Sequence, residues 1–190
     1  LRYGEKLIKK IAEQSPVFID NKHFDIPSTM CAAIQASFDA GASLATVHAM
    51  SGSEALTELA HLEAKLNKQR FFKILAVTIL TSWNEKSYPS ILKLETVADH
   101  VLGLSQLVLE SGLSGLVCSP LELELLKNRN HYLVTPGIRF DLESHGDQKR
   151  IMSPKEALKA GSNILVVGRP IIHAKNPKEK STDYAMSLFE

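Results

Sequence analysis

Six short, almost uninterrupted apolar segments recur along the chain, and helical patterns fill the intervals between them. The predicted strands are Pro16–Asp20, Ser43–His48, Ile74–Leu80, Gly115–Cys118, Tyr132–Thr135 and Asn163–Gly168. Strands without polar alternation are typical of parallel sheets that are covered on both faces. Alternating strands and helices therefore predict an α/β fold, which is either a doubly wound open sheet or a closed (β/α)8 barrel.

The predicted helices carry apolar residues at helical spacing and end signals at their termini. Ser153 followed by Pro154 and Glu156 is typical of a helix start, and Gly161 is typical of the position after a helix end. The predicted helices are Arg2–Glu13, Ser28–Ala40, Ser53–Asn67, Leu92–Ser111, Pro120–Asn128, a helix that begins at Ser153, and Ser181–Phe189.

Composition and charge narrow the class of protein. Lys and Arg number 22 against 21 Asp and Glu, which argues against a general nucleic-acid or membrane-surface binder. No apolar run approaches the roughly 18 residues of a transmembrane helix, and the first residues lack the apolar core of a signal peptide. The two cysteines, Cys31 and Cys118, are too few for a disulfide framework, so we expect free thiols in a cytoplasmic protein.

Polar side chains gather at or after the ends of several predicted strands, which favours the barrel over the open sheet. Barrel enzymes build their sites from the carboxyl ends of many strands, whereas an open sheet concentrates its site at one switch point. These residues are Asp20, Lys22, Asp25, His48, Thr81, Ser82, Arg139 and Arg169, and Gly168 lies directly before Arg169. We expect residues 1–190 to form one barrel domain.

The segment DNKHFDIP contains an acid, a lysine and a second acid in close succession. Asp20 and Lys22 are two residues apart, so on an extended strand their side chains point the same way. A lysine flanked by carboxylates such as Asp20 and Asp25 is a ready proton donor to a carbanion. The alternative is a surface salt-bridge network without a catalytic role.

Two further segments predict a phosphate site. Arg139 follows a Pro-Gly turn after one strand, and Gly168-Arg169 follows the last strand. The loops after the last two strands of barrels often bind phosphate, and arginine offers bidentate contacts to it. The segment 141–150, which contains Gln148, is interpreted either as a lid over the phosphate or as a surface loop.

Two strand-end features remain ambiguous from the sequence. Thr81 and Ser82 could bind a base edge or simply cap the following turn. His48 stands alone at the end of a strand and is interpreted as a structural residue rather than a catalyst.

These motifs together resemble those of the orotidine 5′-phosphate decarboxylase family. DNKHFDIPSTM is similar to its D-x-K-x-x-D-I-P-x-T signature. VTPGIR, GDQKRIMSPKEALKAG and VVGRP are similar to its phosphate-loop and last-strand motifs, in the same order, and AVTILTS and GLVCSP also match. The resemblance implies a homodimeric (β/α)8 barrel that converts orotidine 5′-phosphate to UMP and CO2, without cofactor or metal, in pyrimidine biosynthesis.

The resemblance also implies roles for individual residues. Lys22 would protonate C6 as CO2 leaves, and Asp20 would lie beside the departing carboxylate. Asp25 and Thr29 would reach the site of the partner subunit. The residues implied in substrate binding are Thr81 or Ser82 near the pyrimidine, and Arg139, Gln148, Gly168 and Arg169 at the phosphate.

The resemblance further implies two strands ahead of Pro16–Asp20, so we expect six of the eight strands in an N-terminally incomplete barrel. The first of those strands would end in an Asp that contacts the ribose, and the second in another Lys of the charged array. Two alternatives stay open. One is a Mg²⁺-dependent sugar-phosphate decarboxylase or aldolase of the same superfamily, and the other is a catalytically inactive module that binds nucleotide phosphates.

Overall fold

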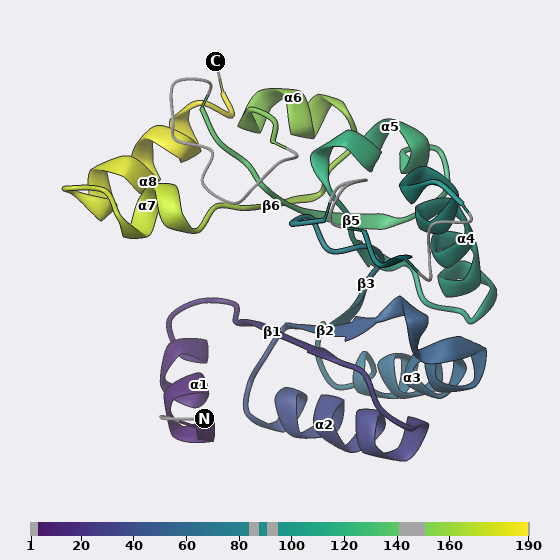
Figure 1. Cartoon of the computed structure of the whole chain (residues 1–190). Helices are drawn as coiled ribbons and strands as arrows, with labels where there is room; N and C mark the ends of the chain where they lie inside the picture. The colour runs from purple at the N-terminus through teal and green to yellow at the C-terminus, as the bar shows by residue number, and fades with distance from the viewer. Residues whose placement is uncertain (1–3, 84–87, 91–94, 141–150, 190) are drawn as a thin grey trace. The chain divides into compact units, whose positions relative to one another are not determined.

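The computed structural model describes residues 4–83, 88–90, 95–140 and 151–189, in which helices follow strands along the chain (Figure 1). They fall into two compact units. The first comprises Leu1–Thr78 with Gly103–Gly115, and the second comprises Ile79–Leu102 with Leu116–Glu190. All six predicted strands are present, so the α/β class and the strand–helix alternation of a (β/α) barrel are confirmed.

The first unit is a parallel sheet whose strand order follows the chain. Its strands are β1 (Phe18–His23), β2 (Leu44–His48) and β3 (Lys73–Val77). Its helices are α1 (Gly4–Ala12), α2 (Pro27–Asp39), the 3₁₀ helix η1 (Ala49–Ser51) and α3 (Gly52–Leu66). The buried positions of β2 and β3 are almost continuous, which explains why their sequences lack polar alternation.

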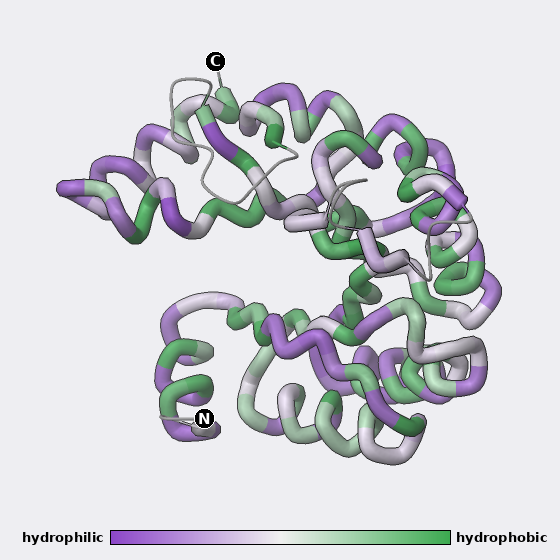
Figure 2. The backbone as a smooth tube through the Cα atoms, viewed as in Figure 1, coloured by the Kyte–Doolittle hydropathy of each residue, from purple (hydrophilic) through white to green (hydrophobic). Residues whose placement is uncertain are grey.

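Helices α2 and α3 pack against each other and bury their apolar sides. Met30 and Ile34 of α2 and Leu56 and Leu59 of α3 are fully buried. Hydrophobic and hydrophilic residues alternate along these helices (Figure 2), as expected for helices that present one side to a sheet.

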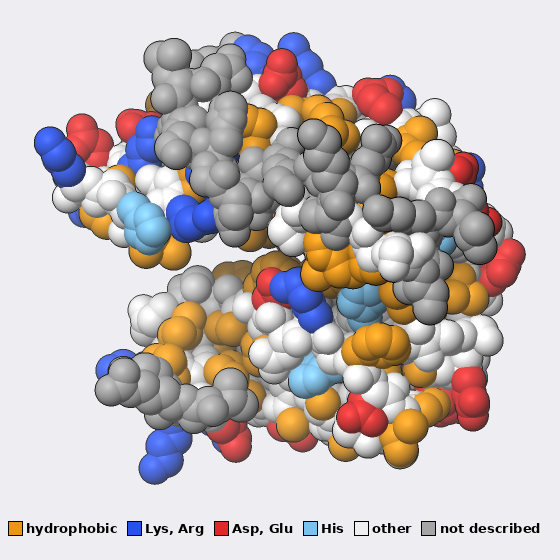
Figure 3. All heavy atoms as spheres, in the orientation of Figure 1, with side chains coloured by type: hydrophobic (Ala, Val, Ile, Leu, Met, Phe, Trp, Pro, Cys, Tyr) orange, Lys and Arg blue, Asp and Glu red, His pale blue; other side chains and the backbone are white. Residues whose placement is uncertain are grey.

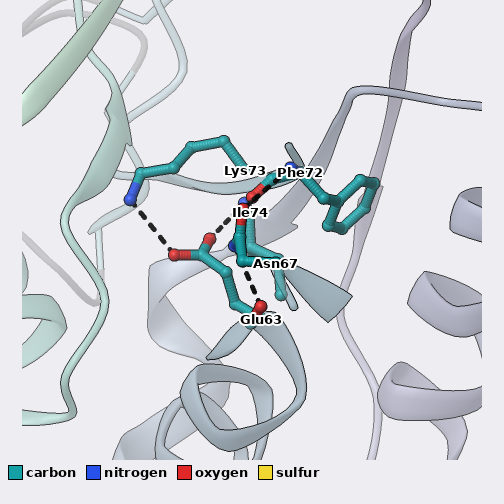
Figure 4. Close-up of polar contacts among 5 residues, drawn as sticks. All are labelled: Glu63, Asn67, Phe72, Lys73 and Ile74. Atoms are coloured by element: carbon teal, nitrogen blue, oxygen red, sulfur yellow. Dashed lines mark hydrogen bonds and ion pairs between the residues drawn. The ribbon is translucent and has the colours of Figure 1, made fainter. Parts of the chain in front are cut away.

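A polar network fixes the start of β3 in the same unit (Figure 4). The Glu63 carboxylate accepts a hydrogen bond from Ile74 N and pairs with Lys73 Nζ at 3.1 Å. The Asn67 side chain accepts from Phe72 N at 3.0 Å and donates to Phe72 O at 2.8 Å. The end of α3 thereby satisfies the backbone groups of the turn that leads into the strand.

The second unit contains β4 (Gly115–Val117, which starts in the first unit), β5 (Tyr132–Pro136) and β6 (Ile164–Val166) in chain order. β5 and β6 pair in parallel. Cys118, which follows β4, donates its backbone N–H to Val134 O of β5. The remaining helices are α4 (Val97–Glu110, shared between the units), the 3₁₀ helix η3 (Pro120–Glu122), α5 (Leu123–Leu126), α6 (Pro154–Lys159), α7 (Arg169–Ile172) and α8 (Pro177–Met186). No helix in the described part of the chain is long and apolar enough to span a membrane.

Several element boundaries differ from the expectation. β3 ends at Val77 rather than Leu80, although Ile79 beyond it is 1% exposed. The apolar run therefore continues into buried residues beyond the end of the strand. Composition does not distinguish buried strand residues from buried residues that follow the strand. The predicted helix over Pro120–Asn128 is split into η3 and α5.

The helix termini show which end signals were informative. Ser153 and Glu156 form the expected capping box at the start of α6. α8 begins at Pro177 rather than Ser181, because the Asn176 side chain accepts from Glu179 N and supplies the cap. The short helix α7 was not predicted, since its four residues give no periodic pattern.

Candidate functional site

The charged motif of the first unit lies on an interruption in the ladder between β1 and β2. The pairs on either side of the interruption are Ile19 with Ala45 and His23 with Val47. The three β1 residues 20–22 therefore lie opposite Thr46 alone. Lys22 has a φ of 51°, in the left-handed region that residues other than glycine rarely adopt.

Three polar contacts join the side chains of this bulge. Lys22 N donates to Thr46 Oγ1 at 2.8 Å, and Thr46 Oγ1 donates to Asp20 Oδ1 at 2.9 Å. The Lys22 ammonium pairs with Asp20 Oδ2 at 2.6 Å. About half of the Asp20 side chain and over a third of the Lys22 side chain are exposed, at 50% and 37%. The pair is thus fixed by the protein and still open to a ligand.

The expected closeness of Asp20 and Lys22 is therefore observed, but its cause differs from the expectation. The strand runs to His23, so both residues lie inside β1 and not at or beyond its end. The left-handed residue breaks the simple alternation of an extended strand. The two side chains meet because of the bulge.

Asp25 and Thr29 lie at the start of α2. Asp25 is exposed, and its Oδ1 accepts a hydrogen bond from Ile26 N at 2.7 Å. Thr29 is exposed in the first turn of the helix. The apolar residues that flank Asp25 are also exposed, Phe24 at 64% and Ile26 at 63%. This carboxylate is therefore flanked by two exposed apolar side chains.

His48 lies close to the charged bulge. Its Nδ1 accepts from Met50 N at 3.3 Å, and its ring lies 5.6 Å from that of Phe24 between centroids. The hydrogen bond makes His48 the cap of η1, as expected of a structural histidine. Burial, and then the positive charge of Lys22, lower the pKa of His48.

Figure 3 shows acidic, basic and histidine side chains close together on the visible face of the molecule. Within the first unit, Lys22 forms an ion pair with Asp20, and its positive charge acts on His48. Sequence reasoning did not select Thr46, although it is fully buried and contacts both members of the ion pair. Its signal was the single hydroxyl within the apolar strand LATVH.

The residues expected to bind a phosphate lie in the second unit. Arg139 is buried, its backbone N donates to Met152 O at 3.1 Å, and its Nε has no hydrogen-bond partner in the described part of the chain. Arg139 also lines a cavity of about 490 Å³. Among the described residues, the other charged side chains that line this cavity are Glu124, Glu156 and Lys159. An unpaired guanidinium nitrogen beside such a cavity is suited to an anion.

Gly168 and Arg169 form the start of α7. Gly168 precedes the helix, and a Cβ built on it would meet nothing within 4 Å, so the space beside its backbone is open. Arg169 is the first helical residue and is half-buried. Gln148 lies outside the described residues, so the lid interpretation of 141–150 stays a prediction.

Thr81 and Ser82 do not end a strand, contrary to the expectation. β3 ends at Val77, and the two residues lie in a turn beyond it, with Thr81 half-buried and Ser82 exposed.

The described residues contain no group of three or more His, Cys, Asp or Glu side chains placed to hold a metal ion.

Comparisons with known proteins give the same family over nearly the whole chain. Residues 1–184 match the model described as the orotidine 5′-phosphate decarboxylase / HUMPS family. The orotidine 5′-phosphate decarboxylase of Dictyoglomus thermophilum is 39% identical over 184 residues, covering 93% of this chain and 75% of the relative. That of Synechococcus sp. (strain CC9311) is 45% identical over 182 residues, covering 92% and 75%.

A solved structure agrees with the sequence relatives. The crystal structure of orotidine 5′-phosphate decarboxylase from Lactobacillus acidophilus superposes with a TM-score of 0.82 at 32% identity, covering 97% of this chain and 81% of that chain. The shared fold is the TIM barrel, of which this chain contributes six described strands. The chain therefore belongs to the orotidine 5′-phosphate decarboxylase / HUMPS family.

Proposed function

We propose that this protein decarboxylates orotidine 5′-phosphate to UMP and CO2 in pyrimidine biosynthesis, without a metal or an organic cofactor. The observation that carries the proposal is the Asp20–Lys22 ion pair at 2.6 Å on a strained bulge. Backbone strain that tertiary contacts maintain is a frequent property of functional sites. Relatives at about 40% identity named for this reaction support the choice of substrate.

In the proposed mechanism, Lys22 supplies the proton that replaces CO2. The bond between C6 of the pyrimidine and the carboxylate carbon breaks, and its electron pair stays on C6. The Lys22 ammonium then donates a proton to C6, and water returns a proton to the amine. Asp20 positions the ammonium through the ion pair and disfavours a neighbouring substrate carboxylate in the ground state.

The phosphate would be bound by residues of the second unit. Arg139 and Arg169 supply guanidinium donors, Gly168 gives open backbone space, and Gln148 contributes an amide. Thr81 or Ser82 would contact the pyrimidine. Contacts to the phosphate are remote from C6, so their binding energy serves to orient the reacting part of the substrate.

The proposal includes a cytoplasmic homodimer in which Asp25 and Thr29 approach the partner's site. Its support is the exposure of Phe24 and Ile26 on both sides of Asp25, because large exposed apolar side chains favour a protein interface. Sedimentation should show a dimer, and Phe24→Asp should shift it toward the monomer. A monomer in the unsubstituted protein would contradict this part of the proposal.

The test is an assay of UMP formation from orotidine 5′-phosphate with and without EDTA, paired with calorimetry of UMP binding. We expect turnover that EDTA does not change. Loss of turnover in EDTA, restored by Mg²⁺, would favour the metal-dependent sugar-phosphate enzyme instead. UMP binding without any turnover would favour the inactive nucleotide-binding module.

A further inference from the structure

Thr46 is the residue of β2 that faces the bulge of β1. It lies between Ala45 and Val47, whose ladder partners on β1 stand on either side of the interruption. Its side chain is fully buried, as are Leu75 and Ala76 on the neighbouring strand β3. A buried hydroxyl needs partners, and Thr46 has two of them in the bulge.

The two hydrogen bonds of Thr46 go to the two members of the ion pair. The hydroxyl accepts from Lys22 N at 2.8 Å, so it replaces the ladder bond that the bulge removes. It gives its proton to Asp20 Oδ1 at 2.9 Å, while Asp20 Oδ2 accepts from Lys22 Nζ at 2.6 Å. Lys22 is therefore restrained at its backbone by Thr46 and at its ammonium by the carboxylate that Thr46 binds.

This closed set of contacts also explains how Lys22 keeps a φ of 51°. A left-handed non-glycine residue persists only when surrounding contacts over-determine it. The Asp20 carboxylate is half exposed, so without Thr46 it could rotate toward solvent and release the ammonium.

We infer that Thr46 is a positioning residue, whose hydroxyl fixes the backbone of Lys22 and the carboxylate of Asp20 so that the ammonium points at the reacting carbon. The inference rests on the proposed decarboxylation. Thr46 itself is buried and acts through its two neighbours.

The test compares Thr46→Val, which keeps the shape and removes the hydroxyl, with Thr46→Ser, which keeps the hydroxyl. Hydrogen bonds to charged groups predict a roughly 10- to 100-fold loss of kcat in Thr46→Val, with KM changed less than about threefold. Thr46→Ser should stay within about threefold of the unsubstituted kcat. Amide hydrogen exchange of Lys22 should become faster in Thr46→Val only.

Thr135→Val is the matched control, since Thr135 is also fully buried on a strand and contacts Ser162 rather than the bulge. It should leave Lys22 exchange unchanged. Unchanged kcat and unchanged Lys22 exchange in Thr46→Val would overturn the inference, as would equal losses in the Val and Ser variants. Absence of turnover in the unsubstituted protein would instead overturn the proposed function, and the exchange of Lys22 would still decide whether Thr46 fixes the bulge.

Discussion

Two of the lysine–carboxylate pairs in the first unit have the same chemistry in opposite surroundings. Lys22 and Asp20 form one pair at 2.6 Å with side chains 37% and 50% exposed. Lys73 and Glu63 form the other at 3.1 Å with side chains 20% and 10% exposed. The pair with the shorter N···O distance is thus the more exposed of the two. The difference that matters here is the burial of the side chains.

The backbone around the two pairs differs in the same direction. Lys73 begins β3 and continues an unbroken ladder with β2, starting at Leu44. Lys22 lies where the ladder with β2 is interrupted, in a left-handed conformation. The Glu63 carboxylate satisfies a buried backbone N–H, that of Ile74, whereas the partners of the Asp20 carboxylate among the described residues are two side chains, those of Thr46 and Lys22.

The role of each ion pair is shown by the other groups that its carboxylate binds. A carboxylate bound to buried backbone stabilises the fold, because its loss leaves a buried donor unpaired. A carboxylate that orients an exposed ammonium contributes little to stability, since exposed pairs gain little in water. The two pairs should therefore respond in opposite ways to matched substitutions.

Lys22→Ala and Lys73→Ala provide the largest contrast. Loss of the proposed proton donor should reduce kcat by at least about 10³-fold, within the range of general acid catalysis, while UMP binding is largely kept. Lys73→Ala should leave kcat within about twofold, because its ammonium pairs with the structural carboxylate of Glu63. Steady-state kinetics and calorimetry with UMP measure both. Near-normal turnover in Lys22→Ala would remove Lys22 from the catalytic role.

Glu63→Ala and Asp20→Ala reverse the contrast in stability. Glu63→Ala leaves the Ile74 N–H buried without its acceptor, so we expect a loss of about 2–4 kcal/mol in the free energy of unfolding. Asp20→Ala should cost less, about 1 kcal/mol, because the ion pair is half exposed and the Thr46 hydroxyl, which loses its acceptor, keeps its bond from Lys22 N; it should still abolish turnover. Urea unfolding followed by circular dichroism decides this. Equal losses of stability would mean that both pairs are structural.

The sequence predicted the architecture well because the relevant signals are local. Six apolar segments of strand length separated by helical patterns require parallel strands, whatever the contacts between them. Boundaries were less predictable, as at β3, where Thr78 and Ile79 are buried like strand residues after the ladder has ended. Burial selects apolar residues in both settings, so composition alone cannot locate the end of the strand.

The site was predicted only in part, for a physical reason. Asp20 and Lys22 could be selected because their charges stand out in an apolar strand. The bulge that brings them together and the role of Thr46 could not, because both depend on the register between β1 and β2. Register is a property of two segments 24 residues apart, as Lys22 and Thr46 are, and no local pattern encodes it.

His48 offers the smallest and most direct test of the comparison, since it senses the charge of one lysine. Burial lowers the pKa of His48, and the Lys22 ammonium lowers it further. Lys22→Ala should therefore raise the pKa of His48 part of the way toward the ordinary 6.5, and Lys73→Ala should not change it. Titration of the imidazole C–H signals by NMR measures the shift.

The sign of the linked stability follows from the same shift. Because the folded-state pKa of His48 is lowered, the unfolded chain binds more protons between that value and 6.5. The protein should lose stability through His48 as the pH falls below 6.5, until the folded-state pKa is reached, and Lys22→Ala should reduce this loss. If the pKa of His48 did not respond to Lys22→Ala, the ammonium would have to point away from the imidazole, and the arrangement of the bulge described here would be wrong.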